Sequence, residues 1–362
     1  MGFKQIEVLL TVVLFGLFSL LSAGCDQTGP NETVRARGSG TVPSNASDSR
    51  LNPDNEPDSV SYPDLLKALG PLSKPGRQYK LGVVVRFFGN PYYQLLMEGM
   101  DSKARELGVY IDYRAGAGES DQLGQCAVFE TMIDGGYDAI LISPQTDVNL
   151  ITAVRRAREK GLLLINIDSA VVPGAEYYVG PNQYESGAIA ARYLLENVPG
   201  GKVVVIKGLE ADYGVNRRTQ GFVDTISGSS FQIIAEPYCV WDLQIALQTA
   251  AQLLEEHPDI SGFFCSNDIM ALGVAQAVRN AGRSGKIVII GRDGIGDAYD
   301  SIRAGAMTAT VSTFPSEIGK IAIDVAVRVL QHQRVPRVVI TPQELLLRGN
   351  MHSSRSGTSS FQ

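Results

Sequence analysis

Residues 81–107 read LGVVVRFFGNPYYQLLMEGMDSKAREL, a strand-like run followed by a helix-like run. The first part, Leu81–Val85, is apolar without alternation, which is typical of a strand buried on both faces of a parallel sheet. The second part, Tyr92–Leu107, has the amphipathic pattern of a helix, and Gly108 follows where a left-handed residue often ends a helix. This stretch therefore predicts one strand–helix unit of an α/β fold.

The same unit recurs along the chain. Further strands are expected at five apolar runs: Ala139–Ile142, Leu162–Ile167, Val203–Ile206, Gly262–Phe264 and Ile287–Ile290. Further helices are expected at five amphipathic stretches: Gln122–Ile133, Val148–Lys160, Tyr184–Asn197, Leu243–Glu256 and Asp268–Ala281. Such alternation indicates right-handed βαβ units and parallel sheets. About ten strands in roughly 270 residues fit one continuous sheet or two smaller doubly wound sheets, and the periodicity leaves both open.

The first 25 residues have the pattern of a bacterial export signal. Lys4 supplies a positive charge, an apolar run extends from Ile6 to Leu21, and small residues precede Cys25. The segment Leu21–Cys25 resembles the lipobox of bacterial lipoproteins, although Ser22 stands where an aliphatic residue is usual. The resemblance implies lipidation of Cys25 and a membrane anchor. The alternatives are an ordinary cleaved signal peptide and an anchor helix, which the run is short for, because a spanning helix needs ~20 residues.

The composition changes between the export signal and the first strand. Residues 26–78 are rich in Gly, Pro, Ser, Asn and Asp and hold few large apolar side chains. A segment that buries so little apolar surface does not offset its ordering entropy, so we expect a flexible tether with one short helical turn at Tyr62–Leu69. The remaining chain, from residue 79, is long enough for two domains.

Charge and cysteine content exclude some function classes. The net charge is −6 and no basic stripe occurs, so binding of nucleic acid has no electrostatic support. Beyond Cys25, the cysteines are Cys126, Cys239 and Cys265, without C-x-x-C spacing. They indicate neither a metal site nor a disulfide framework, and the sequence does not assign a single disulfide among them.

Polar and aromatic side chains follow the apolar runs at their carboxyl ends, the edge at which open parallel sheets bind ligands. Ten of these side chains are candidates for ligand binding: Arg86, Asn90, Tyr92, Tyr93, Asp168, Ser169, Arg218, Trp241, Asn267 and Asp293. Planar amide, carboxylate and guanidinium groups can each hold two neighbouring hydroxyls, and aromatic rings can lie against the C–H face of a sugar. The pattern therefore predicts a polyhydroxylated ligand.

Several candidates also have purely structural interpretations. Asn267 or Asp268 can cap the helix that follows, and Asp293 with Gly294 forms a common turn. The two tyrosines can be core residues, and one of the two adjacent arginines at 217 and 218 can be solvated. The repetition of polar groups at successive strand ends favours the ligand-binding interpretation.

Five segments together resemble the ribose- and galactose-type periplasmic binding proteins. They are Val83–Tyr93, Ile165–Ser169, Arg218–Phe222, Ser266–Gly273 and Gly291–Gly294. The similarity runs in order from about Tyr79 to Gln343. It implies the type I fold, with two doubly wound parallel-sheet α/β lobes joined by a three-stranded hinge. The N-terminal lobe would hold residues 79–182 and 314–342, and the C-terminal lobe 183–313 and 343–352, with 353–362 as a disordered tail.

The resemblance also implies residue roles. It assigns ligand contacts to Asn90, Tyr92, Tyr93, Asp168, Arg218, Asn267 and Asp293, a stacking role to Trp241, and a place near the hinge to Thr313, where many relatives have Gln. The chain departs from the ribose type at Arg86, Ser169, Arg292 and Thr313. These departures argue against ribose itself, and the added arginines allow a sugar acid or a phosphorylated sugar.

The expected function is that of an extracytoplasmic solute-binding protein of an ABC-type sugar importer. The resemblance implies a monomer, in the periplasm or at the cell surface, that closes about its hinge on a sugar-like ligand and docks on a membrane permease. The alternative is an accessory protein that feeds a chemoreceptor or a histidine kinase.

Other classes of protein have little support. An enzyme is disfavoured, because Ala115–Gly118 lacks the third glycine of a dinucleotide fingerprint and no Walker loop or Gly-x-Ser-x-Gly elbow occurs. No cofactor is therefore expected. A lactose-type repressor would begin with a helix-turn-helix, and an export signal stands in that place.

Overall fold

The computed structural model describes residues 51–351. The predictions for the export signal, for lipidation at Cys25, for the first part of the tether and for the tail at 353–362 lie outside the described residues.

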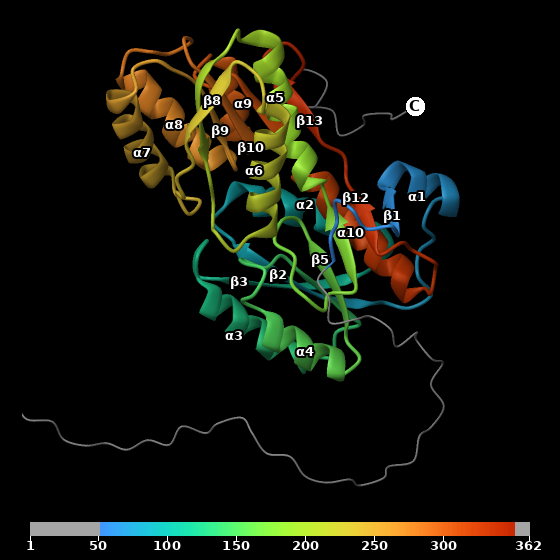
Figure 1. Cartoon of the computed structure of the whole chain (residues 1–362). Coiled ribbons are helices and arrows are strands. Elements are labelled where there is room, and N and C mark those ends of the chain that lie inside the picture. Colours follow the sequence, from blue (N-terminus) through green and yellow to red (C-terminus); the bar gives the residue numbers. More distant parts are fainter. Residues whose placement is uncertain (1–50, 352–362) are drawn as a thin grey trace, which may run out of the picture. The chain divides into compact units, whose positions relative to one another are not determined.

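Two sheets organise the described chain (Figure 1). The first has the strand order β1-β12-β6-β5-β4-β2-β3, and the second has the order β13-β11-β10-β9-β7-β8. The strands of the first sheet are β1 (Ser59–Ser61), β2 (Lys80–Phe87), β3 (Tyr110–Gly116), β4 (Ala139–Ile142), β5 (Leu163–Ile167), β6 (Tyr177–Gly180) and β12 (Val338–Ile340). Those of the second sheet are β7 (Gly201–Ile206), β8 (Phe231–Ala235), β9 (Ile260–Cys265), β10 (Val288–Asp293), β11 (Ala309–Ser312) and β13 (Glu344–Leu347). All neighbouring strands are parallel except β11 and β13.

Helices cover the sheets, and each sheet with its helices is called a lobe below. The first lobe contains α1 (Tyr62–Leu69), α2 (Pro91–Leu107), α3 (Gln122–Ile133), α4 (Ile151–Glu159) and α10 (Pro315–Leu330). The second lobe contains α5 (Gln183–Asn197), α6 (Tyr213–Ile226), α7 (Leu243–Glu256), α8 (Asp268–Asn280) and α9 (Gly296–Arg303).

The first sheet is buried on both faces, as the unbroken apolar runs predict. On β2, Val83 and Val85 pack in one cluster with Leu96 of α2 and Ile318 of α10. The side chain between them, Val84, packs in a second cluster with residues of α3 and α4. Successive residues of a strand point to opposite faces, so a strand between two helical layers must be apolar throughout.

The chain passes between the two sheets three times: from β6 to α5, from β11 to α10, and from β12 to β13. The predicted fold class, two parallel-sheet lobes joined by a three-stranded hinge, is therefore confirmed. The open choice between one sheet and two is resolved in favour of two.

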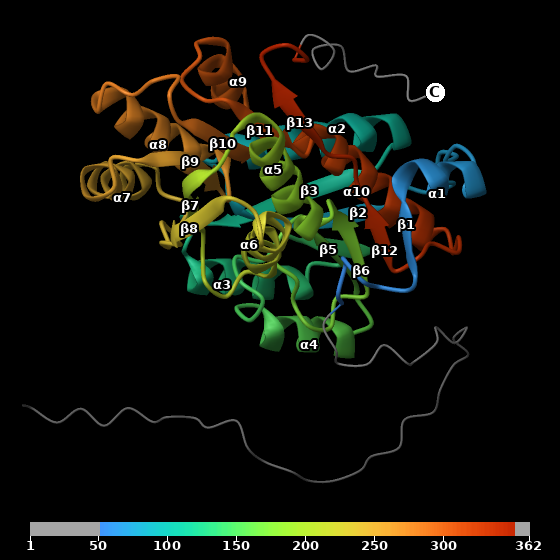
Figure 2. The same cartoon turned by 45° about the horizontal axis from the view of Figure 1, so that its top comes forward.

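Residues 51–78 correct the prediction of a flexible tether. The strand β1 pairs in parallel with β12, which Figure 2 shows beside it, and thereby extends the first sheet. Helix α1 follows at the predicted helical turn, with the Ser61 hydroxyl accepting a hydrogen bond from the Asp64 amide at 3.3 Å. Leu65 is 2% exposed within the main core cluster, and Arg328 of α10 donates to the Gly70 carbonyl at 2.9 Å. The overall polar composition of residues 26–78 gives no sign of this helix cap, or of the few apolar residues through which the segment packs on the first lobe.

Two further findings concern the described residues alone. Cys126, Cys239 and Cys265 are all free thiols. Between residues 51 and 351, no helix combines the length and the hydropathy that crossing a membrane requires.

Candidate functional site

A cavity lies where the carboxyl ends of strands from both sheets face one another. Its lining from the first lobe is Arg86, Asn90, Tyr92, Tyr93, Glu119, Asp168 and Ser169, and from the second lobe Arg218, Trp241, Asn267, Arg292 and Asp293. The structure thus brings together every predicted site residue except Thr313. The volume of the cavity is about 20 Å³, enough for about one water molecule. Side chains of the two lobes therefore nearly fill the cleft, as in a closed arrangement.

Thr313 is the one candidate that lies outside this lining. It is fully buried directly after β11, and its hydroxyl donates to the Asp293 carbonyl at 3.4 Å. It therefore contacts the backbone of a site residue and does not line the cavity.

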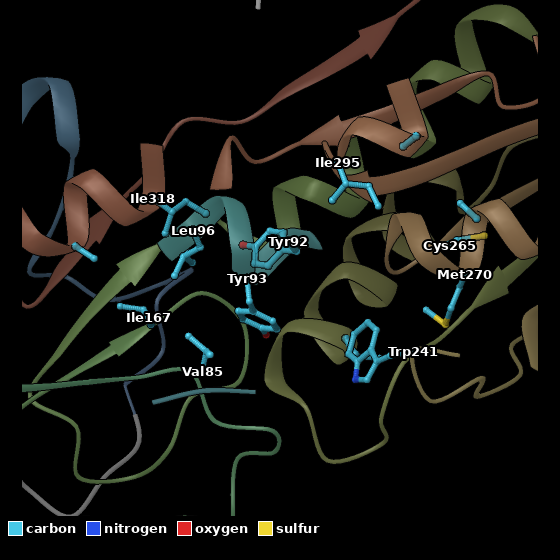
Figure 3. Close-up of a cluster of buried hydrophobic side chains, with 14 of the residues drawn as sticks. Val85, Tyr92, Tyr93, Leu96, Ile167, Trp241, Cys265, Met270, Ile295 and Ile318 are labelled. Carbon is cyan, nitrogen blue, oxygen red and sulfur yellow. The ribbon is translucent and has the colours of Figure 1, made fainter. Parts of the chain in front are cut away.

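The start of α2 places the two tyrosines in the cavity. Asn90 caps the helix by accepting from the Tyr92 amide at 2.9 Å, and Pro91 occupies the first turn, where its missing N–H costs nothing. The two tyrosine rings meet edge to face with centroids 5.3 Å apart (Figure 3). Both rings are nearly fully buried, and Trp241 lies on a separate segment. Helix capping and ligand binding are thus compatible roles for Asn90, whose amide also donates to Glu119 at 2.6 Å.

Asp168 holds a strained backbone conformation at the end of β5. Its φ is 71°, in the left-handed region that a non-glycine residue rarely adopts. Gln183 donates to the Asp168 carbonyl at 2.9 Å, and the Tyr178 hydroxyl donates to the same oxygen. These bonds fix the backbone, so that the carboxylate accepts from the Tyr92 hydroxyl at 2.7 Å. Trp241 (φ 67°) and Asp293 (φ 147°) are strained as well, and such strain gathers at functional sites.

Three buried arginines supply the positive charge of the site. Arg86 pairs with Asp212 at 2.7 Å, and Arg292 pairs with Asp293 at 2.9 Å and with Asp168 at 3.3 Å. Arg218 instead donates to neutral oxygens of Gln183 (2.8 Å), Ser266 (2.7 Å) and Ser169 (2.9 Å).

The ring faces that were expected to stack on a sugar are covered by guanidinium groups. Arg86 lies 5.6 Å from the centroid of the Trp241 ring, and Arg292 lies 5.5 Å from that of Tyr92. Both distances are typical of cation–π contacts. A ligand that stacks on the covered face of either ring must therefore move an arginine.

Burial changes the pKa values of several site residues. It raises the pKa of Asp293 to about 7, against the opposing effect of Arg292. Burial likewise raises the pKa of the Glu119 carboxyl. For Arg218, burial and then the charge of Arg292 lower the pKa to about 10. Shifts of this kind are typical of binding and catalytic sites.

Two donors in the cavity lining have no partner. Trp241 Nε1 and Arg292 Nε are both buried and make no hydrogen bond to the described residues. A buried donor without a partner is costly, so both atoms would gain from acceptor oxygens on a ligand.

The remaining candidates combine structural and site roles. Asn267 caps α8 by accepting from the Met270 amide at 2.9 Å and lines the cavity with the rest of its side chain. Ser169 donates to Asp212 at 3.0 Å. Arg218 lies within α6, which begins at Tyr213 and is capped by Asp212.

Sequence reasoning missed Glu119 as a site residue and left Arg292 out of the candidate set. Glu119 lies in a Gly-rich loop after β3, and its burial depends on the loop folding back to Asn90. Arg292 stands next to Asp293 at the end of β10, so the strand-end rule alone could have included it.

Comparison with known proteins gives the class of the chain. A family model described as periplasmic binding protein domain matches residues 81–334. The chain is 34% identical over 248 residues to the D-allose-binding periplasmic protein of Escherichia coli (strain K12), covering 66% of this chain and 80% of that protein. It is 29% identical over 274 residues to the ribose import binding protein of Bacillus subtilis (strain 168), covering 74% and 87%.

Solved structures agree with the family match. An ABC transporter solute-binding protein from Actinobacillus succinogenes 130z with bound D-allose matches with a TM-score of 0.71 at 24% identity, covering 75% of this chain and 98% of that one. A carbohydrate transporter solute-binding protein from Agrobacterium radiobacter in complex with D-arabinose matches with a TM-score of 0.72 at 26% identity, covering 77% and 98%. The chain belongs to the periplasmic binding protein family.

Family membership confirms two predictions made from the sequence. The chain is a binding protein of sugar transport and not an enzyme. It is also a periplasmic protein, whereas the lipid anchor stays a prediction.

Proposed function

We propose that the chain binds a neutral monosaccharide, or a similar polyhydroxylated molecule, in the cavity between its lobes and passes it to an ABC-type permease. One observation carries the proposal. A single buried cavity combines carboxylate, guanidinium and amide groups with aromatic rings from both lobes, and this set of groups can hold several hydroxyls at once. Relatives named for binding D-allose and ribose support the same class of ligand.

The charges of the site favour a neutral ligand over a sugar acid. The two arginines that raised the possibility of an anionic ligand, Arg86 and Arg292, each pair with carboxylates at 3.3 Å or less. Asp168 lines the same cavity and would repel an anion, as would Asp293 and Glu119 in their ionised forms. Arg218 donates to neutral oxygens of Gln183, Ser266 and Ser169, so its guanidinium can serve hydroxyl oxygens as well as an anion.

Closure about the hinge is the proposed mechanism. Contacts from both lobes reach the ligand only when the lobes are close together, so a ligand that uses them favours the closed arrangement. The closed form then docks on the permease, and the anchor at Cys25 keeps the protein near the membrane. The parent should incorporate a labelled fatty acid and a Cys25→Ser variant should not, and equal labelling of the two proteins would contradict the anchor.

A thermal-shift screen tests the proposed ligand class. A ligand at 100 times its dissociation constant adds about 2.7 kcal/mol to the free energy of unfolding, which raises the melting temperature by several degrees. We expect at least one neutral monosaccharide from a panel with D-allose, D-ribose and D-arabinose to do so. The Asp168→Ala variant should lose the shift, and a folded protein that no neutral sugar stabilises would contradict the proposal.

A further inference from the structure

Residues 51–58, called the strap below, join the two lobes outside the cavity. At its C-terminal end the strap is fixed to the first lobe. Asp58 accepts from the Arg337 amide at 3.1 Å, and the next residues form β1, paired with β12 from Ser59 and Val338 onward. A salt bridge of 3.8 Å between Glu56 and Arg337 adds to this attachment.

The other end of the strap binds the second lobe through one carboxylate. The Asp54 carboxylate accepts from Arg217 Nε at 2.6 Å, from the Tyr213 hydroxyl at 2.9 Å and from the backbone N–H of Gln183 at 3.1 Å. All three donors lie near the N-terminal ends of α5 and α6. The Asp54 side chain is only 3% exposed, so this carboxylate depends on its partners instead of on water.

Apolar packing reinforces the polar contact. Leu51 is 3% exposed in a small cluster that includes Val171, Tyr178 and Val338 of the first lobe and Tyr213 of the second. The Tyr213 hydroxyl also lies 2.9 Å from Asn52 Oδ1 and shares its one proton between Asn52 and Asp54. Separation of the lobes would therefore expose this cluster as well as break the Asp54 bonds.

The strap precedes the part of the chain that the family shares. The family match begins at residue 81, whereas the strap contacts cross from residues 51–58 to residues 183–217. The family domain thus does not itself contain the contacts that the strap makes.

We propose that the strap is an intramolecular latch that stabilises the closed arrangement of the lobes. Opening about the hinge moves α5 and α6 away from the first lobe and pulls three donors from a buried carboxylate. The latch therefore shifts the equilibrium toward the closed form before any ligand binds, and it raises ligand affinity because less free energy is needed for closure. The second consequence rests on the proposed function, whereas the first does not.

Amide hydrogen exchange of the full chain without ligand tests the latch directly. The Asp147 amide donates to the Ala211 carbonyl across the lobes at 2.8 Å, and it exchanges when the lobes part. The Ser143 amide donates to Val84 within the first lobe at 2.9 Å and reports unfolding of that lobe. Asp54→Ala should speed exchange at Asp147 about tenfold or more, because a charge-assisted set of bonds is lost, and leave Ser143 unchanged.

Two further variants make the result specific. Asp259→Ala removes an exposed carboxylate of the second lobe that pairs with Lys202 and lies outside the strap, and it should leave exchange at Asp147 within about twofold of the parent. Arg217→Ala removes the cation of the second lobe that binds Asp54, and it should also speed exchange at Asp147. The double variant Asp54→Ala/Arg217→Ala should exchange at Asp147 little faster than Asp54→Ala alone, because both substitutions remove the same ion pair. Equal exchange at Asp147 in the parent, Asp54→Ala and Arg217→Ala would overturn the latch.

Ligand titration separates the latch from the proposed function. For any sugar that binds the parent, Asp54→Ala should weaken affinity by up to the factor seen in exchange, and Asp259→Ala should not. Faster exchange at Asp147 without any sugar binding would support the latch and refute the proposed ligand class. If a sugar binds, and both exchange at Asp147 and affinity are unchanged in Asp54→Ala, the result would refute the latch and support the proposed ligand class.

Discussion

Arg86 and Asp212 form an ion pair that connects the two lobes, with Nη2 and Oδ2 2.7 Å apart and side chains only 3% and 0% exposed. Both charges are removed from water only while the lobes are closed. The Arg86 side chain is further fixed by a 2.8 Å bond from Nε to the Pro144 carbonyl. The pair therefore couples the electrostatics of the cavity to the position of the lobes.

Removing one partner of this pair should weaken closure. In Asp212→Ala the buried Arg86 charge lacks its partner, which typically costs about 3–5 kcal/mol, and opening relieves that cost by returning the arginine to water. We expect ligand affinity to fall at least tenfold by calorimetry, with a smaller loss of thermal stability. Asp259→Ala, which removes an exposed partner of Lys202, is the control and should leave affinity unchanged. Parent-like affinity in Asp212→Ala would contradict the coupling.

The raised pKa of Asp293 predicts that the stability of the protein depends on pH. Burial raises its pKa to about 7, with Arg292 and Arg218 opposing and Asp268 and Asp168 reinforcing the shift. The folded form then binds more protons than the unfolded form between the ordinary pKa of about 3.9 and about 7. The free energy of unfolding must fall as pH rises through this window.

Melting temperatures from pH 5 to pH 8 check this sign. The parent should melt higher at pH 5 than at pH 8, and Asp293→Asn should lose on the order of 1 kcal/mol of that difference, or about 2–4 °C. Asp268, whose burial raises its pKa to about 6, provides a residual slope in the variant. An identical pH profile in parent and variant would show that Asp293 does not titrate there.

The close approach of α5 to α6 at Gly187 sets the position of Arg218. A Cβ at Gly187 would lie 1.8 Å from the Arg218 carbonyl, so α5 and α6 cannot keep their spacing in Gly187→Ala. Overpacking of this kind costs about 1–3 kcal/mol, and the movement of α6 should displace the arginine and weaken ligand binding. Gly296→Ala is the matched control, because no heavy atom lies within 4 Å of its Cβ. Unchanged stability and affinity in Gly187→Ala would contradict this close approach.

Trp241 should report ligand binding by fluorescence. It is the only tryptophan in the chain, and its ring faces Arg86 with Nε1 unpaired. A ligand that displaces the guanidinium or accepts from Nε1 changes the surroundings of the ring. We expect the emission to change in proportion to occupancy and the signal to vanish in Trp241→Phe. A saturating ligand without any change in emission would place binding away from this ring.

The buried parallel strands of each lobe could be predicted from the sequence. The run at Ala139–Ile142 returns as β4 without change, because a strand buried on both faces has an apolar residue at every position. The three-residue β1 has no such signature, since its side chains are half-buried or exposed and its place depends on pairing with β12, far along the chain.

The same distinction holds at the site. The strand-end rule found Asp168 and Asp293, because strand ends are local features. The Arg86–Asp212 pair joins residues separated by 126 positions and depends on the angle between the lobes, so no local pattern could predict it. The contacts of Asp54 were missed for the same reason, inside a segment whose composition favoured disorder.

Calorimetric titration of the parent and of Asp168→Ala, with neutral monosaccharides and with the corresponding sugar acids, tests the central claim most directly. We expect a neutral sugar to bind the parent with a micromolar or lower dissociation constant, about −8 kcal/mol or better. The matching acid should bind more weakly, and Asp168→Ala should bind neither. Tighter binding of the acid, or parent-like binding of the neutral sugar in Asp168→Ala, would contradict the claim.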